Sequence, residues 1–201
     1  MPAFRAAVLV LILALLAVSP ARAAGDTVAS QIDDARTLYH NGDLAKAAAQ
    51  LEAALIDLQN RLGAALAPMM PPPPAGWEAA ESETQGVGIV GGGITVMRAY
   101  SKGDASMNAT LIMDNPAVAG TAAAFDDLPA AAAQPGMKAL EINGQSALLR
   151  WDDQVKAGEL TMVLGKRVML LVEGNDIPGP EPMIAAAKGW NIAGIRKQAG
   201  L

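Results

Sequence analysis

The stretch that decides the fold runs from Met137 to Asn175 and reads MKALEINGQSALLRWDDQVKAGELTMVLGKRVMLLVEGN. Near its start, Asn143-Gly144 stands between two runs that are rich in apolar residues. An Asn-Gly pair in this setting is a strong signal for a two-residue hairpin turn, because both turn residues need a positive φ. The pair therefore predicts antiparallel strands at Met137–Ile142 and Gln145–Trp151.

A second hairpin is expected in the same stretch. Strands at Glu159–Leu164 and Arg167–Glu173 flank Gly165-Lys166, where glycine comes first, as a type II′ turn requires. The run Val168–Val172 is apolar at every position, which is typical of a central strand covered on both faces, or covered on one and partly exposed on the other. The four strands together form a meander.

The surrounding sequence extends this pattern to an α+β fold. Lys102-Gly103-Asp104 is expected to be a turn between two further strands. Residues Ala117–Ala133 are alanine-rich and expected to be helical, with a break near Pro129. The remaining expected elements are strands at Ile94–Ser101 and Ser106–Asp114 and terminal helices at Glu181–Lys188 and Ile192–Gln198. Residues 77–201 thus form a mainly antiparallel sheet domain with flanking helices.

A helical hairpin is expected at residues 26–67. Asp26 is a plausible N-cap, Asn41-Gly42 ends the first helix, and Asp43 can cap the second. Each helix has one apolar face at 3–4 residue spacing. These faces consist of Val28, Ile32, Ala35 and Tyr39 in the first helix and Leu44, Ala48, Leu51, Leu55, Leu58 and Leu62 in the second. The leucines of the second face, Leu44, Leu51, Leu55, Leu58 and Leu62, are the candidate interaction surface.

Residues 68–76 are expected to link the two parts. They contain Pro68 and the run Pro71–Pro74, and consecutive prolines favour extended polyproline II. Such a segment is a semi-rigid spacer of roughly 20–30 Å. Proline-rich segments also serve as ligands for aromatic grooves, and that alternative stays open.

The first 23 residues indicate export. Arg5 precedes the unbroken apolar run Ala6–Val18, and Ala21-Arg22-Ala23 supplies the small residues that signal peptidase needs. We therefore expect a signal peptide at residues 1–23, cleavage near Ala23, and a periplasmic or secreted mature chain. The run is too short to span a bilayer, which takes about 20 helical residues, and no later segment is long enough for a transmembrane span.

Composition narrows the chemistry of the mature chain. With no cysteine, it forms neither disulfides nor a lipid-anchored lipoprotein. Loss of Arg5 and Arg22 takes the formal charge from −5 to −7. An acidic chain with few aromatic residues is a poor partner for nucleic acid.

Two parts of the chain resemble known families. The hairpin resembles a single tetratricopeptide repeat, on the packing positions Ala35, Leu38, Gly42, Asp43, Leu44, Ala47, Leu51 and Ala54. Gln59 stands where that family usually has proline, and the repeat's tryptophan is absent from the first helix. That resemblance implies helix stacking and no chemistry, and a plain helical hairpin remains the alternative. Residues 77–201 resemble PsbP-like α/β domains in element order and in the Gly76-Trp77 start, which implies an accessory or binding role.

A glycine-rich segment allows two interpretations. Gly91 and Gly93 fit the first two glycines of a dinucleotide-binding turn, and the frame Gly86, Gly88, Gly91 fits its full spacing. However, no buried strand precedes the segment, and β-branched residues follow it. We therefore expect a mobile loop, comprising Gly86, Gly88, Gly91, Gly92 and Gly93, that leads into a strand and could frame an apolar pocket.

No catalytic or metal-binding constellation is evident. His40 is the only histidine and lies at the hairpin turn, so a triad or an ordinary zinc site is not expected. The adjacent pairs Asp33-Asp34, Asp126-Asp127 and Asp152-Asp153 suit caps and turns. The ten methionines are best explained as core residues.

The sequence thus favours a non-enzymatic exported protein, with no cofactor or metal, that associates with itself or with an envelope protein. A module that binds a small apolar ligand or lipid is the alternative. An enzyme that uses carboxylates or a metal is a third possibility, and no residues identify it.

Overall fold

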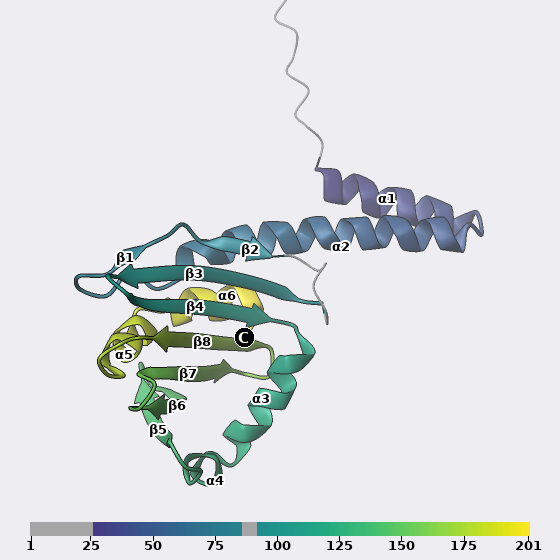
Figure 1. Ribbon diagram of the computed structural model, residues 1–201. Helices are drawn as coiled ribbons and strands as arrows, with labels where there is room; N and C mark the ends of the chain where they lie inside the picture. The colour runs from purple at the N-terminus through teal and green to yellow at the C-terminus, as the bar shows by residue number, and fades with distance from the viewer. Residues whose placement is uncertain (1–25, 86–91) are drawn as a thin grey trace, which may run out of the picture.

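The computed structural model describes residues 26–85 and 92–201 and forms an α+β fold (Figure 1). An antiparallel eight-stranded sheet carries helices on both faces, and a pair of helices extends beyond its edge. The helices are α1 (Thr27–His40), α2 (Leu44–Leu66), α3 (Pro116–Asp126), α4 (Leu128–Ala132), α5 (Glu181–Lys188), α6 (Ile192–Ala199) and the 3-10 turn η1 (Ala67–Met69). The strands are β1 (Glu78–Ala79), β2 (Glu83–Gln85), β3 (Ile94–Lys102), β4 (Ala105–Met113), β5 (Met137–Ile142), β6 (Gln145–Asp152), β7 (Ala157–Leu164) and β8 (Val168–Asn175).

The meander β5–β8 is confirmed, and β8 joins it to the β3–β4 hairpin by pairing with β4. The strand order is β1-β3-β4-β8-β7-β6-β5, with β2 also paired to β3. Asn143 and Gly144 have φ values of 51° and 72°, which the two-residue turn requires. The loop between β7 and β8 differs from expectation. Leu164 pairs with Val168, so the loop has three residues and Arg167 lies outside the strand.

One face of the sheet forms the main core. Side chains of five neighbouring strands line up across it, in the row Val96, Leu111, Leu170, Met162 and Ala147. All five are fully buried beneath α5, α6 and the C-terminal half of α2. Because β8 lies between β4 and β7, it is the central strand that its apolar run predicted.

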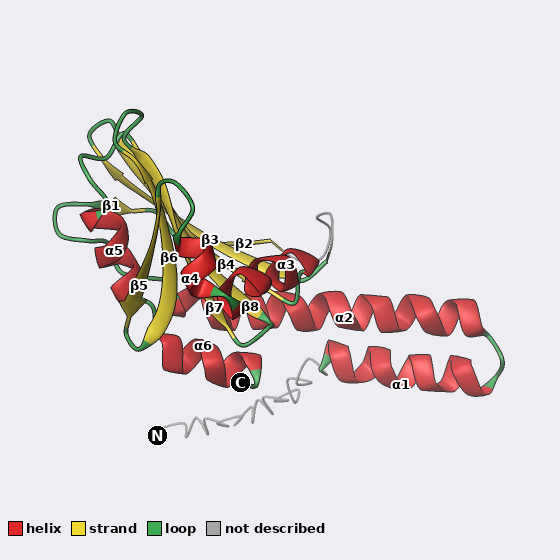
Figure 2. Ribbon diagram, turned by 90° about the horizontal axis from the view of Figure 1, so that it is seen from below, coloured by secondary structure: helices red, strands yellow, loops and turns green. Residues whose placement is uncertain are grey.

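The opposite face is only partly covered. Helices α3 and α4 lie against it, as the view along the sheet shows (Figure 2). Val118 and Ala122 of α3 are buried there. The expected break in this alanine-rich helix occurs at Asp127, whose side chain accepts a 3.1 Å hydrogen bond from the Ala130 N–H and caps α4.

The proline segment packs against the sheet, whereas its composition predicted a semi-rigid spacer. Met70 and Trp77 are buried in the main core. The carbonyl oxygen of Pro71 accepts hydrogen bonds from Tyr100 Oη at 2.7 Å and from Arg98 Nη1 at 3.2 Å. Apolar residues at both ends of the segment hold it against the sheet, so residues 68–76 pack as part of the fold.

The helical hairpin forms as expected, with one difference at its second cap. Asp26 caps α1 by accepting from the Val28 N–H at 3.2 Å, and Gly42 takes the positive φ of 82° that the tight turn needs. Asp43 occupies the N-cap position of α2 but makes no side-chain capping bond. It lies 3.6 Å from Lys46 instead.

Candidate functional site

The two hairpin helices contact each other through small side chains. Val28 and Ala35 of α1 and Ala47 and Ala54 of α2 are the buried residues along this contact. Gln31 Nε2 also donates to Asp57 Oδ2 across the pair at 3.1 Å. Small residues let helices approach closely, so the leucines of α2 are not needed for pairing with α1.

We use the term leucine seam for Leu44, Ala48, Leu51, Leu55, Leu58 and Leu62 of α2. Most of the seam faces outward: Leu44, Leu51, Leu55 and Leu58 are between 47% and 61% exposed. Only Leu62, at the inner end, packs against the main core. Ile32 and Tyr39 of α1, expected on a packing face, are exposed as well. The hairpin therefore carries a large share of the exposed apolar surface.

The seam has the period of a coiled coil. Its spacings of 4, 3, 4, 3 and 4 residues match the alternating core positions of a heptad. From Leu44 to Leu62 it extends about 27 Å at 1.5 Å per residue. In Figure 1 the N-terminal half of α2 projects beyond the sheet, so that half has no cover from the sheet.

At its inner end the seam runs into a groove of 510 Å³. One wall is formed by Leu55, Leu58 and Leu62, and the other includes residues from β3, from the segment after β4 and from α6. Those residues of the opposite wall are Ile94, Asp114 and Gln198. The groove and the seam thus form one continuous apolar strip.

One residue of the groove wall carries a buried polar atom without a partner. Gln59 lines the groove, and its Oε1 is buried with no hydrogen-bond partner among the described residues. A buried acceptor without a donor is unfavourable by about 1–3 kcal/mol. Because this oxygen has no accessible surface, it is not open to an occupant of the groove.

Two residues that line the groove, Arg61 and Asp114, form ion pairs. Arg61 Nη2 lies 2.8 Å from Asp26 Oδ1 and joins α2 to the start of α1. The hydrogen bond from Arg61 lowers the pKa of Asp26. On the opposite wall, Arg167 binds both carboxylate oxygens of Asp114 at 2.7 Å and donates to the Ala199 carbonyl at 2.6 Å. The hydrogen bonds to Asp114 and its negative charge raise the pKa of Arg167.

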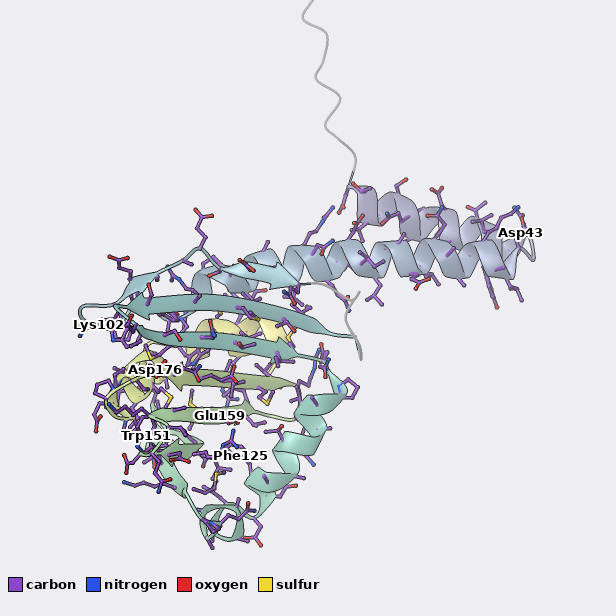
Figure 3. The ribbon with its side chains drawn as sticks, viewed as in Figure 1. Asp43, Lys102, Phe125, Trp151, Glu159 and Asp176 are labelled. Carbon is purple, nitrogen blue, oxygen red and sulfur yellow. The ribbon has the colours of Figure 1, made fainter. Side chains whose placement is uncertain are left out.

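A second candidate site lies on the open face of the sheet. Two hollows, of 420 and 260 Å³, adjoin there and share Arg150 and Glu159. Figure 3 shows Glu159 on this face, and Phe125 of α3 lines the smaller hollow with it. Arg150 Nη2 lies 3.0 Å from Glu159 Oε2, and Thr161 Oγ1 donates to Glu159 Oε1 at 3.1 Å. Both carboxylate oxygens of Glu159 are therefore engaged by neighbouring side chains.

The glycine segment lies partly outside the described residues. Gly86, Gly88 and Gly91 are not among them, whereas Gly92 and Gly93 are. Gly93 has a φ of 89°, and a Cβ there would overlap the Met113 carbonyl oxygen, so the residue must be glycine. Strand β3 begins directly after Gly93, so the helix of a dinucleotide-binding turn does not follow at this point.

His40 and Asp152, two polar residues considered from the sequence, do not form a site in the structure. His40 is exposed at the hairpin turn, and Asp152 accepts from backbone N–H groups in the β6–β7 loop. Within residues 26–85 and 92–201, no group of three or more His, Cys, Asp or Glu side chains could hold a metal ion. No helix in these ranges is long and apolar enough to cross a membrane.

Sequence reasoning missed half of the groove. It identified the leucines but not Ile94, Asp114 and Gln198, which come from distant parts of the chain. It also missed the Arg150–Glu159 pair, because the predicted strands left residues 152–158 as the loop, whereas β6 and β7 are joined by residues 153–156 and this shorter loop sets their register. Comparison with known proteins finds no matching family model, no matching curated protein and no matching solved structure.

Proposed function

We propose that this chain is an exported, non-enzymatic binding protein whose leucine seam docks a partner helix. The observation that carries the proposal is the heptad-spaced, outward-facing seam that ends in an apolar groove. An amphipathic helix in an apolar groove is a recurrent mode of protein recognition, with anchors at 3–4 residue spacing. Export is inferred from the signal-peptide pattern of residues 1–23.

Covering the exposed leucines contributes favourably to such docking. Complete burial of a leucine side chain contributes about 1.5–3 kcal/mol. Leu44, Leu51, Leu55 and Leu58 are each about half exposed, so covering each contributes about 1 kcal/mol more. The gross gain is about 4 kcal/mol from one copy of the chain, before the partner's own apolar surface is counted.

The test is cross-linking in the intact producing cell, followed by purification of the mature protein. We expect specific cross-linked products with the wild-type chain and their loss in Leu51→Glu, which places a charge in the middle of the seam. Asn60→Glu is the matched control, because residue 60 is exposed on α2 outside the seam. The proposal fails if the wild type yields no product, or if the two variants behave alike.

Export is tested separately. We expect the chain in the periplasmic or secreted fraction. Its intact mass should correspond to a chain that begins at Ala24. A chain that retains residues 1–23 and remains in the cytoplasm would contradict the localisation, although it would leave the docking surface untested.

The second candidate function is the binding of a small apolar ligand or lipid. The 510 Å³ groove favours it, since ligand sites are mostly apolar with a few polar groups. Native mass spectrometry of freshly purified protein should then show added mass that Leu58→Glu removes. A mass equal to that of the bare chain would exclude this alternative.

A further inference from the structure

The proposed docking function can be deepened to a specific partner, and the inference that follows rests on that function. We propose that the helix that docks on the leucine seam is α2 of a second copy of this chain. The two α2 helices pair antiparallel about a two-fold axis near residue 53. The tip of each hairpin then enters the groove of the other copy.

The spacing of the seam is compatible with its own reversal. In an antiparallel pair, residues whose numbers add to 106 come opposite each other when the axis lies at residue 53. Leu44 then meets the partner's Leu62, and Leu51 meets the partner's Leu55. Ala48 meets the partner's Leu58, a small residue against a large one. All six seam positions are used twice, as an isologous two-fold contact requires.

The register also gives a role to the two exposed apolar residues that flank the hairpin turn. Tyr39 and Leu44 are 65% and 61% exposed, the largest values on the hairpin for large apolar side chains. Figure 3 marks the tip at Asp43, far from the sheet. With Leu44 opposite the partner's Leu62, the tip lies in the 510 Å³ groove, against the wall that includes Ile94 and Gln198.

The distribution of exposed apolar residues favours this surface for self-association. Stable interfaces bury about 800 Å² on each partner. Seven of the nine exposed large apolar side chains of the described residues lie on the hairpin, and the other two, Val155 and Leu201, lie elsewhere. Four of the hairpin residues, Leu44, Leu51, Leu55 and Leu58, lie on the seam itself. The seven are Ile32, Tyr39, Leu44, Leu51, Leu55, Ile56 and Leu58.

The register makes one unfavourable contact, which is useful as a test. Glu52 flanks the seam next to the two-fold axis, so the Glu52 side chains of both copies come close together. Glu52 has no ion-pair partner among the described residues. Its replacement by glutamine removes a repulsion between like charges, which should lower the dimer Kd about two-fold or more. If the seam were unpaired, or bound an unrelated helix, Glu52→Gln would not strengthen self-association.

The absence of native cysteine allows a direct measurement of register. Single-cysteine variants of the mature chain are treated with a short bismaleimide cross-linker, which joins only thiols that lie close together. We expect Glu52→Cys to form a covalent dimer by itself, and Ala45→Cys to link to Gln59→Cys when the two variants are mixed. Ala45→Cys alone should remain monomeric on a denaturing gel. A dimer of Ala45→Cys alone would indicate parallel pairing and overturn the proposed register.

Sedimentation velocity separates this inference from the proposed function. We expect a concentration-dependent dimer that is abolished by Leu51→Glu, kept by Asn60→Glu and tightened by Glu52→Gln, with unchanged circular dichroism. The wild-type chain could stay monomeric and still capture another protein through the seam. That result would overturn the proposal that the partner is a second copy, and it would leave the docking function intact. A monomer that captures nothing overturns both.

Discussion

The contact between Tyr100 and the proline segment allows a sharp prediction about stability. Tyr100 is 2% exposed, and its hydroxyl donates to the Pro71 carbonyl at 2.7 Å. Tyr100→Phe removes this hydrogen bond and leaves the carbonyl oxygen with its 3.2 Å bond from Arg98. Because that acceptor keeps one partner, we expect a loss of about 1 kcal/mol in the free energy of unfolding at pH 7.

The same hydroxyl makes the effect depend on pH. Burial raises the pKa of Tyr100 from 10.0 to about 12, although the charge of Arg98 works in the opposite direction. Between these two values the unfolded chain has lost the proton and the folded chain still holds it. The unfolded state therefore binds fewer protons, and stability falls as pH rises through this window. With these pKa values the fall between pH 8 and pH 11 is about 1.4 kcal/mol.

The assay is urea unfolding of the wild type and Tyr100→Phe at intervals from pH 7 to pH 11. Taking the difference between the two proteins cancels the titration of the other groups. We expect an advantage of about 1 kcal/mol for the wild type at pH 7 that disappears by pH 11. A difference that stays constant over this range would refute the argument that the phenol is buried and held protonated.

Three further predictions concern packing. Gly93→Ala should destabilise the fold by more than about 2 kcal/mol, because its Cβ would overlap the backbone at the end of β4. Gly92→Ala, at φ 73° with no atom within 4 Å of its Cβ, should cause a loss of only about 1 kcal/mol. Equal losses in chemical denaturation would contradict the close approach at Gly93. Leu170 is fully buried in β8, so Leu170→Ala should lower the free energy of unfolding by about 2–5 kcal/mol. Leu51→Ala should change the stability of the isolated chain by no more than about 1 kcal/mol. Thermal melts that rank the two variants otherwise would refute the assigned core. Arg167→Ala should lower the free energy of unfolding by about 1–2 kcal/mol, since its ion pair with Asp114 is partly exposed. Because Arg167 also donates to the Ala199 carbonyl, backbone hydrogen exchange should rise in α6 first. Unchanged exchange in α6 would show that the arginine does not hold this helix.

Local sequence signals predicted most of the secondary structure. The turn at Asn143-Gly144 and the strands beside it depend on a few adjacent residues, and both were correct. The central position of β8 followed from its uninterrupted apolar run. The loop after β7 was predicted one residue too short, because Arg167 is kept out of the strand by its pair with Asp114, which is distant in the chain.

By itself, the sequence determined the α+β class, the hairpin with its leucine period, and the absence of disulfides. Only the tertiary structure decided that the proline segment packs on the sheet, because Tyr100 and Pro71 meet across 29 positions of the chain. It also decided that α1 packs on the alanines of α2 and leaves the leucines outward. The period of an apolar face is a local property, whereas the choice of the face to bury depends on which other elements come close to it.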